Sequence, residues 1–346
     1  MRSAQASCPT GRGPQGRFRS KRVVTVAVTF LGLALLAGCQ ATGLPTGRPA
    51  QQTTINVAAI KGVDDAPFFV ALKAGAFARA GLNIKLHTYG SVAQELQALG
   101  KGTVDIAAGD YVDFFSLVAK SGHPYLSIVA DGYHAGLGVM EVLTLPGSGI
   151  TTPQSLANHT IGTSQPQGAD YSSTKPYSLE TLATQSVMKN DGVVMSNVSW
   201  KPMPTANLIG ALENHQVSAI LVEEPNIFEA ESKLGAVPVL DSCSSETANL
   251  PLSGYFATSA FVRDHPITLR TFRDVLQQAQ KAAVLPGQIR AEIASQPGMT
   301  MQTSSLITLG AYPTTLNAAS LQRVADLMFN AEMLSSSLNV SSMIAK

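Results

Sequence analysis

The stretch LQALGKGTVDIAAGD (residues 96–110) decides the fold class of this chain. It contains the end of a helix-like run, a turn with two glycines and a short apolar run that closes on an aspartate. A helix followed by a buried strand is the repeating unit of an α/β protein with mainly parallel strands. The stretch IGALENHQVSAILVEEP (209–225) repeats the same order and also ends on acidic residues. The two stretches therefore predict two α/β blocks.

The alternation of strands and helices continues on both sides of these stretches. In the first block we expect strands at 53–60, 82–89 and 104–109, and helices at 67–80, 91–100 and 110–122. In the second block we expect strands at 159–164, 198–203, 218–223 and 237–241, and helices at 178–192, 205–216 and 225–235. A strand within 253–266 then leads into helices at 265–284 and 317–334. Ligands of open parallel sheets bind at the carboxyl ends of the strands, so we expect the functional residues there.

The N-terminus has the three parts of a bacterial export signal in the right order. RFRSKR (17–22) is basic, VVTVAVTFLGLALLA (23–37) is apolar but short for a membrane span, and LAGC (36–39) resembles a lipobox. This pattern predicts a lipoprotein signal peptide over residues 1–38 and a lipid on Cys39. The Gly, Pro, Thr and Gln residues that follow predict a flexible tether over residues 39–52.

The charge and cysteine content exclude several classes of function. The first 38 residues hold six basic residues and no acid, so 18 Lys and Arg face 23 Asp and Glu in the rest, a net charge of −5. A mildly acidic body without a basic stripe argues against nucleic acid as a partner. After processing and lipidation Cys243 is the one remaining free thiol, so we expect no disulfide. No metal-ligand spacing, nucleophile elbow or phosphate-binding loop occurs, and we expect neither metal nor cofactor.

The stretch after the first expected strand, IKGVDDAPFF (60–69), places two carboxylates at the start of a helix. One aspartate is expected to cap the helix, since Asp is common at this position. The other is expected to face a solute and accept its hydrogen bonds. Lys61 either neutralises one of them or is a solvated strand-end residue. The candidate site residues in this stretch are Gly62, Asp64, Asp65 and Phe68.

Further candidates follow other expected strands or lie between the two blocks. Asp110 either caps the next helix or faces the solute, and Tyr111 is a candidate stacking wall. In the acidic pair before Pro225, one glutamate either faces the solute or bridges the two blocks. The remaining candidates are Ser91, which is also a plausible helix N-cap, Tyr133, His134, Ser164, Gln165, Gln167, Glu223 and Glu224.

The order of these phrases resembles a known family. ALKAGAFARAGLNIKLHTYGS (71–91), PGSGITTPQSLANHTIG (146–162) and SGYFATSAFVRDHP (253–266), together with the two opening stretches, are similar to solute-binding proteins of ABC importers. The similarity is to the nitrate, sulfonate, taurine and thiamine-precursor type. It covers nearly the whole mature chain, which makes it far more specific than a short motif.

The resemblance implies a periplasmic-binding-protein type II fold with two α/β lobes. Lobe I would comprise residues 53–145 and 247–346, and lobe II residues 146–246, with crossing segments at 131–145 and 250–260. It also implies a monomer that is not an enzyme, is exported and is lipid-anchored on the outer face of the bacterial cytoplasmic membrane. A solute would bind between closing lobes and pass to a permease with its ATPase. The cysteine-rich motif of related pyrimidine-synthesising enzymes is absent here.

The acidic strand ends predict the charge of the solute. Five carboxylates, those of Asp64, Asp65, Asp110, Glu223 and Glu224, face one nearby cation, Lys61. Carboxylates opposite a sulfonate or nitrate would cost several kcal/mol. We therefore expect a neutral or cationic solute rich in N–H donors, such as a nitrogenous heterocycle. An exported enzyme acting on a small nitrogenous compound and a solute-sensing lipoprotein are the alternatives.

Overall fold

Two five-stranded sheets form the framework of the protein, which a computed structural model describes over residues 52–121, 125–165 and 175–346. The signal peptide, Cys39 and nearly all of the tether lie outside these residues, as does Gln167. The first sheet consists, in spatial order, of β2 (Leu82–His87), β1 (Thr53–Ala58), β3 (Ile106–Asp110), β10 (Pro251–Thr258) and β4 (Leu126–His134). The second consists of β7 (Ser199–Met203), β6 (Thr160–Ser164), β8 (Ala219–Glu223), β5 (Met140–Thr144) and β9 (Val237–Asp241).

Both sheets combine parallel and antiparallel pairs. In the first sheet β1 pairs in parallel with β2 and β3, whereas β10 is antiparallel to β3 and β4. In the second, β6 is parallel to β7 and β8, whereas β5 is antiparallel to β8 and β9. The parallel strands of each sheet therefore end at one common edge, as the sequence predicts.

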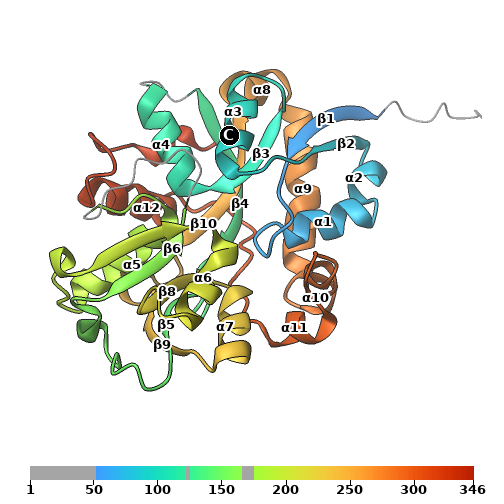
Figure 1. The fold of residues 1–346 in the computed structure, drawn as a ribbon. Helices are drawn as coiled ribbons and strands as arrows, with labels where there is room; N and C mark the ends of the chain where they lie inside the picture. Colours follow the sequence, from blue (N-terminus) through green and yellow to red (C-terminus); the bar gives the residue numbers. More distant parts are fainter. Residues whose placement is uncertain (1–51, 122–124, 166–174) are drawn as a thin grey trace, which may run out of the picture. The chain divides into compact units, whose positions relative to one another are not determined.

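Twelve α-helices in the described residues surround the two sheets (Figure 1). Those on elements of the first sheet are α1 (Ala66–Lys73), α2 (Ala76–Arg79), α3 (Val92–Gly100), α4 (Tyr111–Ser121), α8 (Ser259–Asp264), α9 (Pro266–Ala282), α10 (Gly287–Ala294) and α11 (Met301–Leu306). The second sheet carries α5 (Leu179–Asn190), α6 (Thr205–Glu213) and α7 (Asn226–Leu234), while α12 (Ala318–Asn330) packs against both α4 and α5. The single helix predicted over 67–80 is broken in two, because Gly75 adopts a positive φ of 67°.

Local sequence signals explain where the main helices begin. The hydroxyl of Ser91 accepts a hydrogen bond from the amide of Gln94 at the start of α3, which confirms its expected role as an N-cap. Ser178 and Thr181 form a reciprocal capping box at the start of α5. These caps fix the direction in which each helix leaves the strand end before it.

An aromatic core holds α1, α2 and α9 against the first sheet. Phe68 and Phe77 pack on Phe272, with ring centroids 6.3 and 5.4 Å from it, and Phe68 also contacts Tyr255 of β10. All four side chains are at least 99% buried, and burial of each phenylalanine contributes about 2–3 kcal/mol. In Figure 1, α9 accordingly runs beside α1 and α2.

The two crossings between the sheets run side by side. The chain leaves β4 at His134 and enters β5 at Met140, and it returns between Asp241 of β9 and Pro251 of β10. Backbone hydrogen bonds of 2.9 Å join the crossings, from Ala135 N to Leu250 O and from Ser242 N to Met140 O.

The strand pairing places the boundary between the lobes before residue 140, whereas the sequence predicts it at residue 145. Residues 140–144 form β5, which pairs with β8 and β9 of the second sheet instead of belonging to lobe I. Likewise, most of the predicted crossing 250–260 is β10, which lies between β3 and β4 in the first sheet. The sequence pattern does predict a strand within 253–266, whereas β5 falls entirely inside the segment 131–145 that was expected to be a crossing.

Candidate functional site

The carboxyl ends of the parallel strands in both sheets carry acidic side chains whose charges affect one another's pKa values. Asp64 follows β1 and Asp110 ends β3 in the first sheet, while Glu223 ends β8 in the second. The charges of Asp64 and Asp110 contribute to raising the pKa of Glu223 well above its usual range, after burial as the main cause. The edges of the two sheets predicted to hold a ligand therefore lie close enough for these carboxylates to interact.

Asp64 and Asp65 have different environments. Asp64 is half-buried, and burial is the main cause that raises its pKa to about 6. Asp65 is buried and accepts a hydrogen bond of 2.7 Å from the hydroxyl of Tyr255. It occupies the N-cap position of α1, but its side chain makes no cap hydrogen bond. One aspartate therefore occupies the N-cap position as expected, but it makes no side-chain cap hydrogen bond, and its carboxylate accepts from Tyr255.

The loop between β1 and α1 also contains other predicted residues. Gly62 is half-buried in this loop. The amine of Lys61 lies 3.8 Å from the carboxylate of Glu292 in α10 and over the ring of Phe69, so it neutralises neither aspartate. A second buried carboxyl, that of Glu95 in α3, lies near Asp65. Burial and the charge of Asp65 raise the pKa of Glu95 to about 8.

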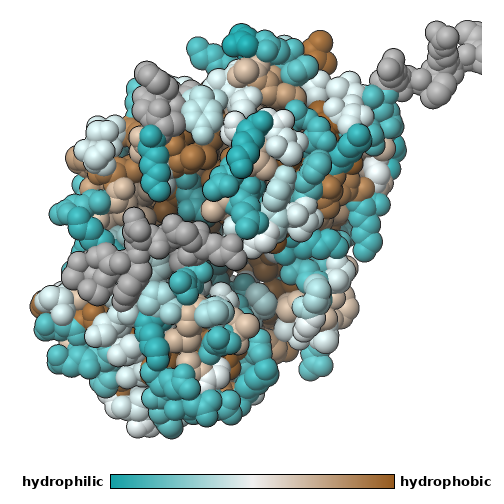
Figure 2. Space-filling model, turned by 45° about the horizontal axis from the view of Figure 1, so that its top comes forward, coloured by the Kyte–Doolittle hydropathy of each residue, from teal (hydrophilic) through white to brown (hydrophobic). Residues whose placement is uncertain are grey.

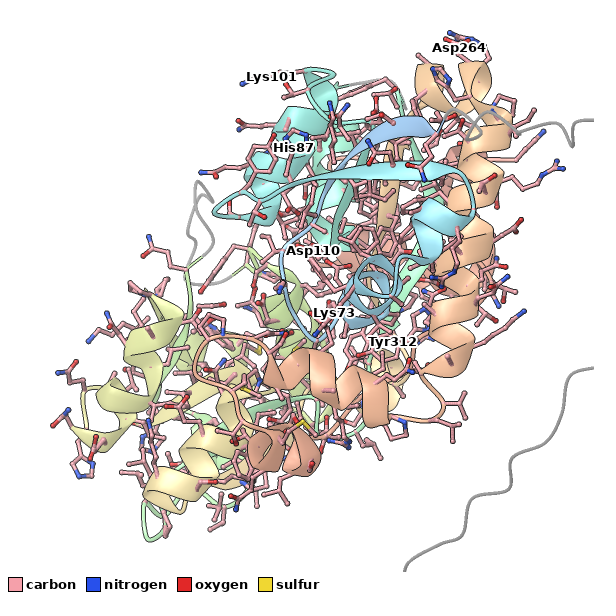
Figure 3. The ribbon with its side chains drawn as sticks, turned by 90° about the vertical axis from the view of Figure 1, so that its right-hand side faces the viewer. Lys73, His87, Lys101, Asp110, Asp264 and Tyr312 are labelled. Atoms are coloured by element: carbon pink, nitrogen blue, oxygen red, sulfur yellow. The ribbon has the colours of Figure 1, made fainter. Side chains whose placement is uncertain are left out.

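Asp110 both starts a helix and belongs to the site. Its Oδ1 accepts a hydrogen bond of 2.7 Å from the amide of Asp113 in the first turn of α4. Burial and the negative charge of Asp113 raise the pKa of Asp110 well above its usual range. Figure 3 places Asp110 in the middle of the molecule, away from His87 and Lys101 of the same lobe. Both roles expected for this residue are therefore compatible.

Glu180 of α5 interacts electrostatically with carboxyls at the ends of both sheets. Its carboxylate accepts a hydrogen bond of 3.4 Å from the hydroxyl of Ser164 at the end of β6. Its negative charge contributes to the raised pKa values of four carboxyls that come from both sheets, those of Asp64, Asp110, Asp113 and Glu223. We call these five residues, Asp64, Asp110, Asp113, Glu180 and Glu223, the acidic cluster. Gln165, beside Ser164, is exposed.

The acidic cluster lacks a salt bridge to Lys or Arg within the described residues. Lys120 of α4 lowers the pKa of Asp113, but this effect comes after those of burial and of Glu180. Burial is the main cause that raises the pKa values of Asp64, Asp110, Asp113 and Glu223, so these four carboxyls hold protons at unusually high pH. Such a site can accept hydrogen bonds from N–H donors, and it favours a positive charge over a negative one.

Several predicted site residues belong to the core instead of the acidic cluster. Phe68 and Tyr111 are fully buried, so neither can form the wall of an open site. The hydroxyl of Tyr111 donates to Asp131, and its ring packs on Phe115 and Phe256. The prediction of a stacking wall at Tyr111 is wrong because the residue lies on the face of α4 that covers the sheet.

Tyr133 and His134 end β4, where the chain leaves the first sheet. Both are more than 90% buried. The hydroxyl of Tyr133 accepts a hydrogen bond from the amide of Gly310. The Nε2 atom of His134 lies 2.9 Å from Oδ2 of Asp131, within hydrogen-bonding distance. These contacts give the two residues a structural role at the crossing between the sheets.

The side chain of Glu224 has different partners from that of Glu223. Its Oε1 accepts a hydrogen bond of 2.9 Å from the amide of Thr308, and its Oε2 accepts one of 3.2 Å from the amide of Phe228. Of the two roles expected for the acidic pair, Glu224 has the bridging one, and Glu223 lies in the acidic cluster.

Sequence reasoning missed Glu180 and Asp113 as members of the cluster. Glu180 is the second residue of a capped helix that follows a polar loop, and acidic residues are common there for their effect on the helix dipole. Its position after the loop that was expected to line the site is the one signal that pointed to it. Asp113 lies one turn after Asp110, so helical periodicity places it near the same strand end.

Other features of the described residues lie elsewhere. No group of three or more His, Cys, Asp or Glu residues there is arranged to hold a metal. None of the helices described is long and apolar enough to cross a membrane. A cavity of about 130 Å³ lies between β4 and α9. The guanidinium of Arg273, which lines it, donates hydrogen bonds to the carbonyl oxygens of Val129 and Ala345.

Figure 2 shows a face of the molecule that is largely hydrophilic, with hydrophobic residues visible in patches.

Solved structures of low sequence identity share this fold. The periplasmic aliphatic sulphonate binding protein SsuA from Escherichia coli is 15% identical, with a TM-score of 0.67 over 84% of this chain and 97% of that chain. The zinc-bound ligand-binding component of an ABC-type import system from Staphylococcus aureus is 14% identical, with a TM-score of 0.66 over 85% and 96%. The desulfurization enzyme DSZB is 16% identical, with a TM-score of 0.64 over 85% and 96%.

These similarities confirm the predicted periplasmic-binding-protein type II fold. No curated protein sequence matches the chain. The NMT1-like family matches residues 48–296, which is well over half of the sequence. The resemblance seen in the sequence is thus confirmed at the level of the family, and the chain belongs to the NMT1-like family.

Proposed function

We propose that this protein is the extracytoplasmic solute-binding component of an ABC importer. Two similar structures are a sulphonate-binding periplasmic protein and a ligand-binding import component, and the family match is consistent with that role. The observation that carries the proposal is the acidic cluster, in which Asp64 and Asp110 of the first sheet's strand ends interact with Glu223 at the end of β8 in the second. A solute held there contacts both lobes at once, as a binding protein that closes by hinge motion requires.

The solute that fits the acidic cluster is neutral or cationic and rich in N–H donors. Asp64 and Glu223 are half-buried carboxyls whose pKa values burial raises. An anion brought next to them would lose hydration and gain repulsion. A nitrogenous heterocycle or an amine would instead donate hydrogen bonds to them. This chain would then differ from the sulphonate-binding protein in ligand charge while sharing its fold.

Export and anchoring complete the proposal. The signal in residues 1–38 would direct export, and a lipid on Cys39 would anchor the protein to the outer face of the cytoplasmic membrane. A lipid anchor on a flexible tether would keep a binding protein close to its permease and allow it to reorient. We propose that the protein acts as a monomer beside a permease and an ATPase.

The experiment that tests this function is thermal unfolding of the mature protein against defined solutes. Cytosine and putrescine represent the neutral and cationic classes, and ethanesulfonate and nitrate represent the anions. Stabilisation grows with the ratio of solute concentration to Kd, so true ligands raise the melting temperature in a dose-dependent way. A shift with a neutral or cationic compound supports the proposal. A shift with the anions alone contradicts the solute class, and no shift across a broad panel contradicts solute binding.

The similarity to the desulfurization enzyme favours one alternative, an exported enzyme. Its candidate groups are His134 and Cys243. His134 is buried against Asp131, and burial raises the pKa of the Cys243 thiol, which opposes formation of a thiolate. Turnover of a small nitrogenous compound that His134→Ala abolishes would support the enzyme. A third role, a solute-sensing lipoprotein, would be opposed by adjacent genes for a permease and an ATPase.

A further inference from the structure

A third connection between the lobes runs beside the two crossings. It consists of residues 307–312, which follow α11, and we call it the strap. It passes close to the first crossing, since a Cβ added to Gly136 would lie 3.2 Å from the Cα of Gly310. The strap contacts the end of β4, the residue after β8 and the loop that carries Asp64.

The first contact fixes the strap to the end of β4. His134 and Ala311 exchange two backbone hydrogen bonds, of 2.8 and 3.1 Å. The amide of Gly310 donates to the hydroxyl of Tyr133. A Cβ on Gly310 would lie 2.1 Å from the carbonyl oxygen of His134, so only glycine allows this approach. The strap is therefore tied to the point where the chain leaves the first sheet.

The second contact joins the strap to the second sheet. Glu224 directly follows β8, and its carboxylate accepts hydrogen bonds from the amides of Thr308 and Phe228. The ring of Phe228 packs against an apolar cluster that includes Ile307 of the strap and Ile289 of α10. One carboxylate thus holds the start of α7 and the strap together.

The third contact reaches the loop of the acidic cluster. The hydroxyl of Tyr312 donates a hydrogen bond of 2.7 Å to the carbonyl oxygen of Val63, the residue before Asp64. That same carbonyl accepts a hydrogen bond from the amide of Ala66. The ring of Tyr312 also packs on Tyr133, with centroids 5.0 Å apart. Figure 3 shows Tyr312 on the α10 and α11 side of the molecule.

We propose that the strap couples the position of the second sheet to the Asp64 loop, with Glu224 and Tyr312 as positioning residues that do not touch the solute. Glu224 links the second sheet to one end of the strap, and Tyr312 links its other end to Val63. Movement of the second sheet then changes the orientation of Asp64 through a chain of specific hydrogen bonds. Its meaning for solute affinity rests on the proposed function, but the coupling itself exists in the protein without solute.

Hydrogen exchange of backbone amides, resolved by mass spectrometry, tests the coupling. In Glu224→Ala we expect the amides of Thr308 and Ala66 both to exchange roughly two- to tenfold faster, the factor for loss of one hydrogen bond. The Glu224 carboxylate accepts its hydrogen bonds from Thr308 and Phe228, and within the described residues it forms none with the Asp64 loop, so faster exchange at Ala66 reports transmission. Glu224→Gln retains a side-chain oxygen that can accept from Thr308, and it should restore protection at both sites.

Two further variants separate transmission from general loosening. Tyr312→Phe should speed exchange at Ala66 and leave Thr308 protected, because the Glu224 contact persists. Glu213→Ala, which removes an exposed acid from α6 of the same lobe, should change neither amide. The proposal is overturned if Glu224→Ala speeds exchange at Thr308 while Ala66 is unchanged, or if Glu213→Ala has the same effect as Glu224→Ala. These measurements use no solute, so their outcome is independent of the thermal test of function.

Discussion

The hydroxyl of Tyr255 donates a 2.7 Å hydrogen bond to Asp65, and both side chains are more than 90% buried. The bond joins β10 of the first sheet to the start of α1. Burial raises the pKa of Asp65 to about 7, although this hydrogen bond acts in the opposite direction and lowers it. The residue beside Asp65 in the sequence belongs to the acidic cluster, so this buried pair supports the loop that carries it.

Removal of this hydroxyl should destabilise the protein. In Tyr255→Phe the buried carboxyl of Asp65 loses its donor, and we expect the free energy of unfolding to fall by about 1–3 kcal/mol. Urea unfolding at pH 8, where Asp65 is largely ionised, measures the change. Tyr125→Phe is the matched control, since that ring is 36% exposed. Equal stability of Tyr255→Phe and the wild type would show that the hydrogen bond contributes nothing.

Stability without solute should decrease from pH 5 to pH 8. Burial raises the pKa values of Asp64 to about 6, Asp65 to about 7 and Glu95 to about 8. The folded protein then binds more protons than the unfolded chain above pH 4, so stability is full below the unfolded pKa and is lost as pH rises through these values. Each unit of difference corresponds to about 1.4 kcal/mol.

Urea unfolding at pH 5, 6, 7 and 8 checks this dependence. Asp65→Asn removes one of the titrating groups and should flatten the curve between pH 5 and pH 8. A free energy of unfolding that rises with pH over this range would contradict the environment described for these carboxyls.

Glu180 should control the titration of its neighbours across the two sheets. In Glu180→Gln a negative charge disappears, so the pKa values of Asp64, Asp113 and Glu223 should all fall. Carbon-13 NMR of the side-chain carboxyls, followed through pH, measures each value. Glu213→Gln, on an exposed position of α6, should leave them unchanged. If Glu180→Gln shifts only residues of the second sheet, then the sheets do not meet at the acidic cluster.

Two glycines should respond oppositely to alanine. At Gly254 of β10 a Cβ would lie 2.4 Å from the hydroxyl oxygen of Tyr111, so Gly254→Ala should cost about 1–3 kcal/mol. At Gly210, within α6, nothing lies within 4 Å of an added Cβ. There alanine should stabilise by up to about 1 kcal/mol through its higher helix propensity. Chemical unfolding measures the free energy of unfolding of both variants. A Gly254→Ala variant as stable as the wild type would refute the packing of Tyr111 on β10.

Much of the framework follows from local sequence patterns. The stretch 96–110 predicts the end of α3, the strand β3 and the position of Asp110, because helix periodicity and a short apolar run are both local signals. The break at Gly75 and the strand β5 were missed. The first depends on one backbone angle, and the second on pairing with strands about 80 and 100 residues away in the chain.

The site is harder to predict than the framework, for a physical reason. Strand-end residues such as Asp64, Asp110 and Glu223 follow from the parallel-sheet rule. The burial of Tyr111 depends on which face of α4 meets the sheet, and the role of Glu224 depends on Thr308, 84 residues away in the sequence. Contacts of that kind arise from tertiary packing, which local patterns do not encode.

The charge of the natural solute tests the central claim most directly. Mass spectrometry of the compound released from mature protein purified under native conditions identifies it without a choice of candidates. The acidic cluster predicts a neutral or positively charged compound rich in N–H donors, with weaker retention in Asp64→Asn than in the wild type. Release of a sulfonate or nitrate, retained equally by Asp64→Asn, would contradict the account.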